Sequence, residues 1–307
     1  MEVDEPRENR MKIVLLFVTI GYSIPCYIFH LLTIYILCAH RFRHRFQYSF
    51  YTLFKIQCVL DVCFQVINAV MFRLPYSTLA NKLLTDVASI RRGAVPTVGH
   101  FLYYYLFYAN TFSIALVSSN RIVIMVLPKR VHEGWNRVLP YLLIALFVIP
   151  IALTWHIPIG GSFFVESEDA FTPDHNKVFG IRNSQYTFFL HTIIDTFVLI
   201  VNLIIIGFIV KNRKKGINWP EIKLFMLTVF NFACQCVRDV FQFLAYSQLC
   251  ETCYATIFLV HPFMIDAATL LNPWFLLATS MAFRKSVKEL LPFKYSGAKR
   301  VSVVPTI

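Results

Sequence analysis

Several charged residues of this sequence lie within long apolar stretches. Asp61, Asp195 and Asp266 each lie near the middle of such a stretch, and in another Arg238 is followed directly by Asp239. An ionised group in hydrocarbon is costly, so these side chains are expected to face polar partners or to serve a function. Arg238 has several acidic residues to pair with, and Asp266 and Asp195 are the first two to test.

A second polar group is predicted from depth along the stretches. Asp61, Asn110 and Asn272 fall at similar depths. We expect them to form a polar cluster that holds water or a sodium ion. The alternative is hydrogen bonding between helices without an ion, worth about 1 kcal/mol per bond. The sequence leaves both interpretations open, and it predicts no other metal ion and no cofactor.

The apolar stretch 100–127 places polar and aromatic residues on one helical face. Arg121, preceded by Asn120, lies near its C-terminal end, and steps of three or four residues lead back to Asn110, Phe107 and Tyr103. This face therefore carries a guanidinium at one end, an amide in the middle and aromatic rings at the other end. The alternative is that Arg121 only reaches out to the lipid headgroups.

Aromatic and polar side chains gather at the end of the stretches opposite Arg121. They predict a ligand pocket made of His100, Tyr103, Tyr104, Phe107, His191, Gln242, Tyr246 and His261. The alternative is a belt of aromatic residues at the lipid headgroups. The N-terminal part of the stretch 100–127 contains no acidic residue to balance a charged amine, so we expect a small, apolar or weakly polar ligand.

Enzyme motifs are missing from the sequence. It contains no Gly-x-Ser-x-Gly, no His-Glu-x-x-His and no Walker loop, so we expect no catalytic residues and no enzyme activity. His40 and His44 alternate with arginines, which fits a basic loop better than a metal site. Cys250 and Cys253 are close enough in sequence to form a local disulfide.

The composition shows where these residues must lie. Of 307 residues, 57% are apolar and only 15% are charged, against about 45–50% and about 25% in soluble domains. Such a chain has too little polar surface for a water-soluble globule, and it is not a nucleic-acid-binding protein. Seven stretches are long enough to cross a bilayer, which takes about 20 residues. They are 13–39, 48–72, 100–127, 139–158, 185–210, 222–246 and 254–283.

We therefore expect an all-α membrane protein, a seven-transmembrane helix bundle over residues 1–283. The connecting loops are short except for those that follow Phe72 and Pro158. Residues 284–307 form a tail that begins with a short amphipathic helix. Apolar residues recur there between basic ones, at Phe283, Val287, Leu290 and Leu291.

Charge predicts the orientation in the membrane. The net charge is +12, and most lysines and arginines lie in the tail and in the loops on the same side of the bundle as the tail. Basic loops stay in the cytosol, so the N-terminus is expected outside and the C-terminus inside the plasma membrane. The basic residues then face anionic lipid, and the lipid bilayer is the first partner of the chain.

The order of several motifs resembles rhodopsin-like G-protein-coupled receptors. Two motifs carry this similarity, Asn120-Arg121 followed by Pro128, and Asn272-Pro273. Three further stretches look like nematode serpentine chemoreceptors of the gamma superfamily, class gamma or class V. These are Gly21-Tyr-Ser-Ile-Pro25, Phe46-Gln-Tyr-Ser-Phe50-Tyr51 and Arg73-Leu74-Pro75. The resemblance implies a small-molecule ligand, a heterotrimeric G protein as partner and a place in sensory neuron cilia.

The resemblance also implies roles for single residues. In such receptors the arginine matching Arg121 holds the inactive state and then contacts the G protein. The residues matching Asp61 and Asn272 belong to the activation network. Asn120 stands where an acidic residue usually clamps the arginine, so a weaker inactive lock is expected. Leu276 stands where a tyrosine usually follows the Asn-Pro pair.

Two other functions compete with a receptor. A transporter or ion channel would use Asp61, Asp195 and Asp266 as an ion path. The sequence shows no internal repeat, which disfavours a transporter built from repeats. A membrane scaffold without a ligand would show no loss of function when the aromatic pocket is changed.

Overall fold

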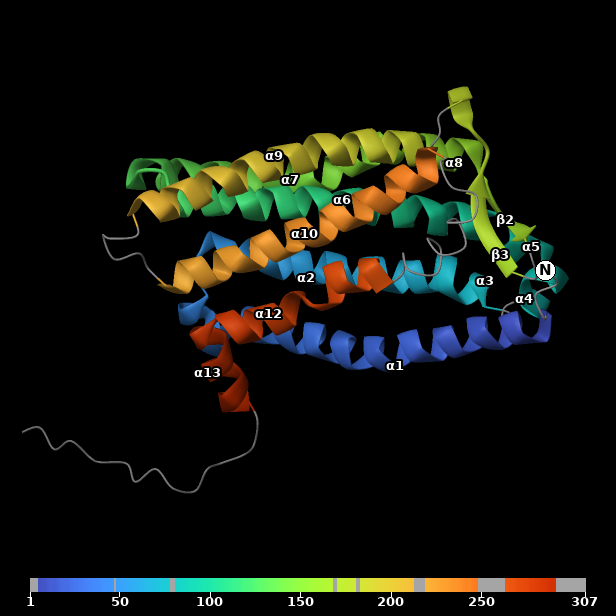
Figure 1. Cartoon of the computed structure of the whole chain (residues 1–307), viewed down its shortest axis with the longest axis horizontal. Helices are drawn as coiled ribbons and strands as arrows, with labels where there is room; N and C mark the ends of the chain where they lie inside the picture. Colours follow the sequence, from blue (N-terminus) through green and yellow to red (C-terminus); the bar gives the residue numbers. More distant parts are fainter. Residues whose placement is uncertain are drawn as a thin grey trace, which may run out of the picture.

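The computed structural model is a bundle of long helices with a small β-sheet at one end and a short helix at the other (Figure 1). We call these the hairpin end and the α13 end. The structure describes residues 5–46, 48–77, 81–167, 170–180, 183–212, 219–247 and 263–290.

The bundle contains six long helices and one that is interrupted. The long helices are α1 (Glu5–Cys38), α2 (Ser49–Asn68), α6 (Ala94–Met125), α7 (Lys129–Thr154), α9 (Asn183–Asn212) and α10 (Trp219–Ser247). The interrupted one runs over residues 263–270 and continues, after a turn at Leu271, as α12 (Asn272–Thr279). Short helices complete the loops. These are α3 (Leu74–Tyr76), α4 (Asn81–Asp86), α5 (Ala88–Arg91) and α8 (His156–Gly160).

Several helix bounds differ from the predicted spans. The helix α1 begins at Glu5 rather than at 13, and α6 begins at Ala94 rather than at 100. The helix α7 begins at Lys129 rather than at 139, because polar residues extend it beyond the apolar stretch. The last span ends at Thr279 rather than at 283, because Ser280 takes an extended conformation. The amphipathic helix is α13 (Met281–Leu290), which buries Phe283 and leaves the bundle at an angle (Figure 1).

Within the described ranges, four helical segments are long and apolar enough to cross a membrane by length and composition alone. They are Lys12–Cys38, Ser49–Arg73, Arg130–Gly160 and Gln185–Asn212. Their outer faces expose large apolar side chains, such as Phe17, Tyr141 and Ile193, as lipid-facing surfaces do. The helices α6 and α10 are of similar length but carry more polar residues.

The helix α6 lies at the centre of the bundle. It contacts α2, α7, α9 and α10, and it contributes the largest share of the buried polar residues. A helix that is buried on most sides can be less apolar, because its polar groups meet other helices instead of lipid.

A three-stranded antiparallel sheet covers the hairpin end, where the sequence predicted only loops. Its strands are β1 (Arg92–Gly93), β2 (Ser162–Ser167) and β3 (Ala170–His175). The strand β2 begins after Gly161, whose φ of 70° turns the chain out of α8. The side chains of Phe164 and Phe171 point to one face and pack with Met71 at the end of α2. Their alternation was too short to stand out in the sequence.

Candidate functional site

A carboxylate and three amides meet in the middle of the bundle. Asp61 of α2 accepts hydrogen bonds from Asn110 Nδ2 at 2.7 Å and from Asn272 Nδ2 at 2.7 Å. Gln57 Nε2 donates a third at 3.1 Å, and it also donates to Asn110 Oδ1. All four side chains are buried. The structure thus brings the three residues of the predicted polar cluster together, and it joins α2, α6 and α12.

Gln57 was not among the residues predicted for this cluster. It lies four residues before Asp61, a spacing that places both on one helical face. The three groups bonded to the carboxylate are amide N–H groups, and the amide oxygens of Gln57 and Asn272 are buried without a hydrogen-bond partner among the described residues. No group of three or more His, Cys, Asp or Glu side chains suited to a metal occurs in the described ranges. The sodium ion stays a prediction.

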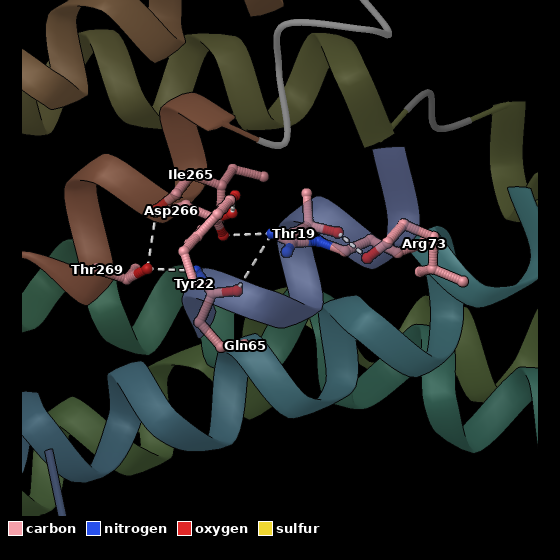
Figure 2. Close-up of polar contacts among 8 residues, drawn as sticks. Thr19, Tyr22, Gln65, Arg73, Ile265, Asp266 and Thr269 are labelled. Atoms are coloured by element: carbon pink, nitrogen blue, oxygen red, sulfur yellow. Dashed lines mark hydrogen bonds and ion pairs between the residues drawn. The ribbon is translucent and has the colours of Figure 1, made fainter. Parts of the chain in front are cut away.

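A buried ion pair links α1, α2 and the last span near the hairpin end (Figure 2). Arg73 forms an ion pair with Asp266 Oδ1, and the Tyr22 hydroxyl donates to Asp266 Oδ2. Gln65 donates to Thr269 and lies 3.4 Å from the Arg73 guanidinium. The Arg73 and Asp266 side chains are only 8% and 5% exposed. Both oxygens of Asp266 therefore have a partner.

The pairing of Asp266 corrects the first alternative proposed from the sequence. Asp266 pairs with Arg73, not with Arg238. Arg73 directly follows the apolar stretch 48–72, so the sequence predicted it to lie in the following loop. A π-helical turn over Ala69–Arg73 extends α2, so that the guanidinium reaches the bundle interior. No sequence motif predicts this π-helical turn.

Arg238 belongs to a second group, formed by α6, α9 and α10. Its Nη2 lies 2.9 Å from His191 Nδ1, and its guanidinium carbon lies 4.6 Å from the centre of the Phe107 ring. The same His191 nitrogen lies 3.1 Å from Asp239 Oδ1. On its other side, His191 Nε2 lies 3.1 Å from the Thr111 hydroxyl, and the imidazole stacks on Phe107 at 4.6 Å. Two of the predicted pocket residues, Phe107 and His191, thus meet.

The other aromatic residues of the predicted pocket pack closely. Tyr103 and Phe107 are buried in a cluster with Phe64 of α2, and the Tyr103 ring also contacts Phe72 at 4.3 Å. These rings form a core between α2 and α6. Gln242 and Tyr246 lie in α10, but their side chains are outside the described part of the structure, as is all of His261. Cys250 and Cys253 also lie outside the described residues, so their disulfide stays a prediction.

Three histidines meet under the sheet at the hairpin end. His100 of α6 stacks on Tyr104, and its ring centre lies 5.2 Å from that of His175 in β3. His156 of α8 lies 6.5 Å from His175 and bonds to Asn183 at 2.7 Å. Burial lowers the pKa of His175, and the nearby His156 and Lys177 lower it further, against the opposite effect of Asp174. We call the sheet and these three histidines the cap. Two predicted pocket residues, His100 and Tyr104, therefore lie at the cap.

Arg121 lies inside the bundle near the α13 end. It is only 1% exposed, and its guanidinium carbon lies 3.7 Å from the centre of the Phe50 ring of α2. An arginine in this position does not extend to the headgroups. The structure therefore favours Arg121 as part of the polar face of α6 over Arg121 as a headgroup contact. Asn120 accepts hydrogen bonds from Ser49 at 2.6 Å and from Trp135 at 2.9 Å. Asn120 therefore bonds to α2 and α7.

The two predicted prolines lie at helix starts near this end. Pro128 is the N-cap residue of α7, directly after the turn that ends α6. Pro273 occupies the first turn of α12, where a missing N–H group costs nothing. Asn272 comes just before it and reaches Asp61.

Comparison with known proteins identifies the family. The sequence profile of the Srg family chemoreceptors matches residues 16–287 of this chain. The chain belongs to the Srg chemoreceptor family. It is 21% identical to serpentine receptor class gamma-11 of Caenorhabditis elegans, over 73% of this chain and 70% of that protein. It is 25% identical to serpentine receptor class gamma-20 of the same organism, over 50% of this chain and 44% of that protein.

Membership in the Srg family confirms several predictions from the sequence. The chain is a multi-pass membrane protein with a seven-transmembrane helix bundle, and its family is one of receptors rather than of enzymes. The class gamma relatives favour class gamma over class V.

Proposed function

We propose that this Srg chain is a chemosensory receptor that binds a small ligand in the hairpin half of the bundle and activates a heterotrimeric G protein at the α13 end. It would act in the plasma membrane of sensory neurons, in their cilia. The family supports the chemosensory role. The printed names of its relatives, serpentine receptors of class gamma, agree with it.

The observation that carries the proposal is the course of α6. At the hairpin half, Phe107 and Thr111 contact His191 of α9. In the middle, Asn110 bonds to Asp61. At the other end, Arg121 is buried against Phe50. One helix thus joins a polar group near the predicted ligand site to an arginine about 21 Å further along, at 1.5 Å per residue.

The orientation follows from the basic residues at the α13 end. Arg41, Arg43 and Arg45 lie in the turn after α1, and α13 adds Arg284, Lys285 and Lys288. Basic residues near membrane ends stay in the cytosol. The α13 end is then cytosolic, and Arg121 lies where a G protein binds.

The acidic residues proposed for an ion path belong to separate groups. Asp61 accepts bonds from three amides, Asp266 is paired with Arg73, and Asp195 lies on α9. Nothing in this arrangement favours a transporter or a channel over a receptor.

The central test is the substitution Arg121→Ala in cells that report G-protein activation. We expect activation to be lost while the protein still reaches the cell surface. Arg130→Ala is the matched control, because Arg130 is exposed on α7 near the same end. Normal signalling by Arg121→Ala would show that transduction does not depend on this arginine.

Two further measurements test the ligand half and the orientation. Phe107→Leu is expected to shift ligand potency without changing the maximal response.

Epitope tags at both termini, read in intact and permeabilised cells, should place the N-terminus outside. A C-terminal tag accessible in intact cells would place Arg121 outside the cytosol and end the receptor proposal.

A further inference from the structure

We propose that a groove between α9 and α10 binds a protonated amine with an apolar body, which enters from the lipid side. The groove is a site of its own, apart from the aromatic cluster predicted from the sequence. Its binding can be tested without signalling, and only its effect on the G protein rests on the proposed function.

The groove has the size and the walls of a small-molecule site. Its volume is about 390 Å³, within the range of roughly 300–1,000 Å³ typical of ligand pockets. Most of its lining is apolar. The lining residues are Phe188, Thr192, Asp195, Thr196, Leu199, Phe232, Cys236, Asp239, Val240 and Phe243.

The groove opens on the outer surface of the bundle. Thr192, Thr196 and Leu199 of α9 are exposed, as are Val240 and Phe243 of α10. In a membrane these side chains face lipid. A ligand that dissolves in the bilayer can therefore reach the groove sideways, between the two helices.

Two carboxylates line this otherwise apolar groove. Asp195 is 7% exposed, no N–H group donates to either of its oxygens among the residues that the structure describes, and its polar neighbour is the carboxyl group of Asp239. Asp239 is bonded to His191. A buried carboxylate without a donor is costly, so a group that donates to Asp195 would bind here with a gain in free energy.

The nearby charges favour a cationic group. The groups around the groove are Asp195 and Asp239, with Arg238 and His191 behind them. The Arg238 guanidinium lies over Phe107 in the bundle interior, and it approaches His191 at 2.9 Å. With both acids ionised and the histidine neutral, the two acids and one arginine carry one net negative charge. An ammonium group balances that charge and supplies three donors.

Two hydroxyl oxygens add to this preference. Thr192 and Thr196 donate their hydroxyl protons to backbone carbonyls of α9, at 2.8 Å and 2.7 Å. Their oxygens keep lone pairs and can only accept from a ligand in the groove. The polar atoms of the lining thus call for donors, while Phe188, Phe232 and Phe243 suit an apolar chain or ring.

The ligand class of the groove differs from that predicted for the aromatic pocket. The N-terminal part of the stretch 100–127 contains no acidic residue, whereas the counter-ions of the groove lie on α9 and α10. Asp239 also contacts His191, which stacks on Phe107 of α6. An amine bound at Asp239 is therefore two side chains away from the helix that carries Arg121.

The test is photolabelling of the full chain in phosphatidylcholine nanodiscs. The probes are a decylamine and a decanol that carry the same diazirine, and labelled peptides are identified by mass spectrometry. We expect the amine to label residues 188–199 and 232–243 on the order of tenfold more than the alcohol, the ratio that one charge-assisted hydrogen bond supports. An excess of unlabelled decylamine should remove this labelling.

Variants connect the labelling to the carboxylates. Asp195→Asn and Asp239→Asn should each reduce amine labelling toward the level of the alcohol. Asp86→Asn is the matched control, because Asp86 is exposed on α4 at the hairpin end. If a variant does not fold, the competition by decylamine on the unchanged protein still decides the question.

A last arm distinguishes two sources of the amine. Adding phosphatidylethanolamine to the nanodiscs will abolish labelling if the occupant is an aminolipid of the membrane. It will leave labelling unchanged if the occupant is a dissolved amine, and either result supports an amine site. Equal labelling by amine and alcohol would overturn the proposal and indicate that the two carboxyls share a proton. Because labelling needs no G protein, its outcome is independent of the result for Arg121→Ala.

Discussion

The two halves of the bundle treat their buried carboxylates differently. In the half formed by α1, α2, α6 and the last span, Asp61 and Asp266 have partners on every oxygen. In the half formed by α9 and α10, no N–H group donates to Asp195 among the described residues, and its polar neighbour is a second carboxyl group, that of Asp239. Both side-chain polar atoms of Asn202 on α9 and of Gln235 on α10 lack a hydrogen-bond partner among these residues. Both halves are buried, so exposure to solvent does not explain the difference.

We call the half formed by α1, α2, α6 and the last span the frame, because its buried carboxylates are hydrogen-bonded. The half formed by α9 and α10 contains buried polar groups that lack hydrogen-bond donors within the described part of the structure. Buried polar groups are stable only when they are hydrogen-bonded, and each missing partner costs about 1–3 kcal/mol. The two carboxylates of the first half meet that requirement within the bundle. The second half would meet it with a ligand or after a rearrangement of α9 and α10, which is what a receptor that responds to a ligand requires.

The largest effect is expected when the ion pair of the frame is broken. Asp266→Ala leaves the Arg73 guanidinium buried without its partner, which should lower the free energy of unfolding by about 3–5 kcal/mol. Thermal unfolding of the purified protein measures it. The double variant Arg73→Met with Asp266→Leu should recover most of the loss, because no charge is then left unpaired. Equal losses in the single and double variants would show that the pair contributes packing rather than charge.

The next effect concerns Asp61 in the amide cluster. Asp61→Asn replaces one of two oxygens, which together accept three N–H hydrogen bonds, by an NH₂ group that cannot accept. We expect a loss of about 1–3 kcal/mol in the free energy of unfolding. Thermal unfolding measures it, once in sodium chloride and once with choline chloride in its place. If sodium stabilises the unchanged protein and not the variant, the predicted sodium ion is present.

The same substitution should act in the opposite direction in the other half. Asp195→Asn removes a buried charge and offers Asp239 a donor, so stability should rise by about 1 kcal/mol. Asp61→Asn is the matched comparison, since the chemical change is identical. A loss of stability at both positions would mean that Asp195 has a partner as good as that of Asp61, and the contrast between the halves would disappear.

The smallest effect is a pH dependence confined to the cap. Burial lowers the pKa of His175 from 6.5, so the unfolded chain binds the proton more readily than the folded one. The contribution of His175 to stability is therefore complete above about pH 6.5 and declines as the pH falls below it. Unfolding followed between pH 5 and pH 8 should show this slope, and His175→Gln should reduce it. A slope that is unchanged in the variant would assign the pH dependence to other groups.

The sequence predicted the buried polar groups best where their residues lie on one face of a single helix. Asn110 and Arg121 share a face of α6 because of simple helical spacing, and Asp61 and Asn272 were placed at the matching depth. The partners of Asp266 and Arg238 could not be predicted in this way. Each depends on the rotation of one helix relative to another, and for Arg73 on a π-helical turn that changes the rotation within a helix.

The amino-acid sequence is sufficient to predict a membrane bundle of apolar helices with a basic, amphipathic end. The length of an apolar stretch and the charge of a loop are local properties. They determine whether a segment crosses the bilayer and which side a loop occupies. Only the tertiary structure decided which polar residues are satisfied. It placed Arg73 against Asp266, packed the aromatic residues of α6 into a core, and left Asp195 beside a groove between α9 and α10. Hydrogen bonds require side chains within about 3 Å, and only the packing of whole helices fixes distances that short.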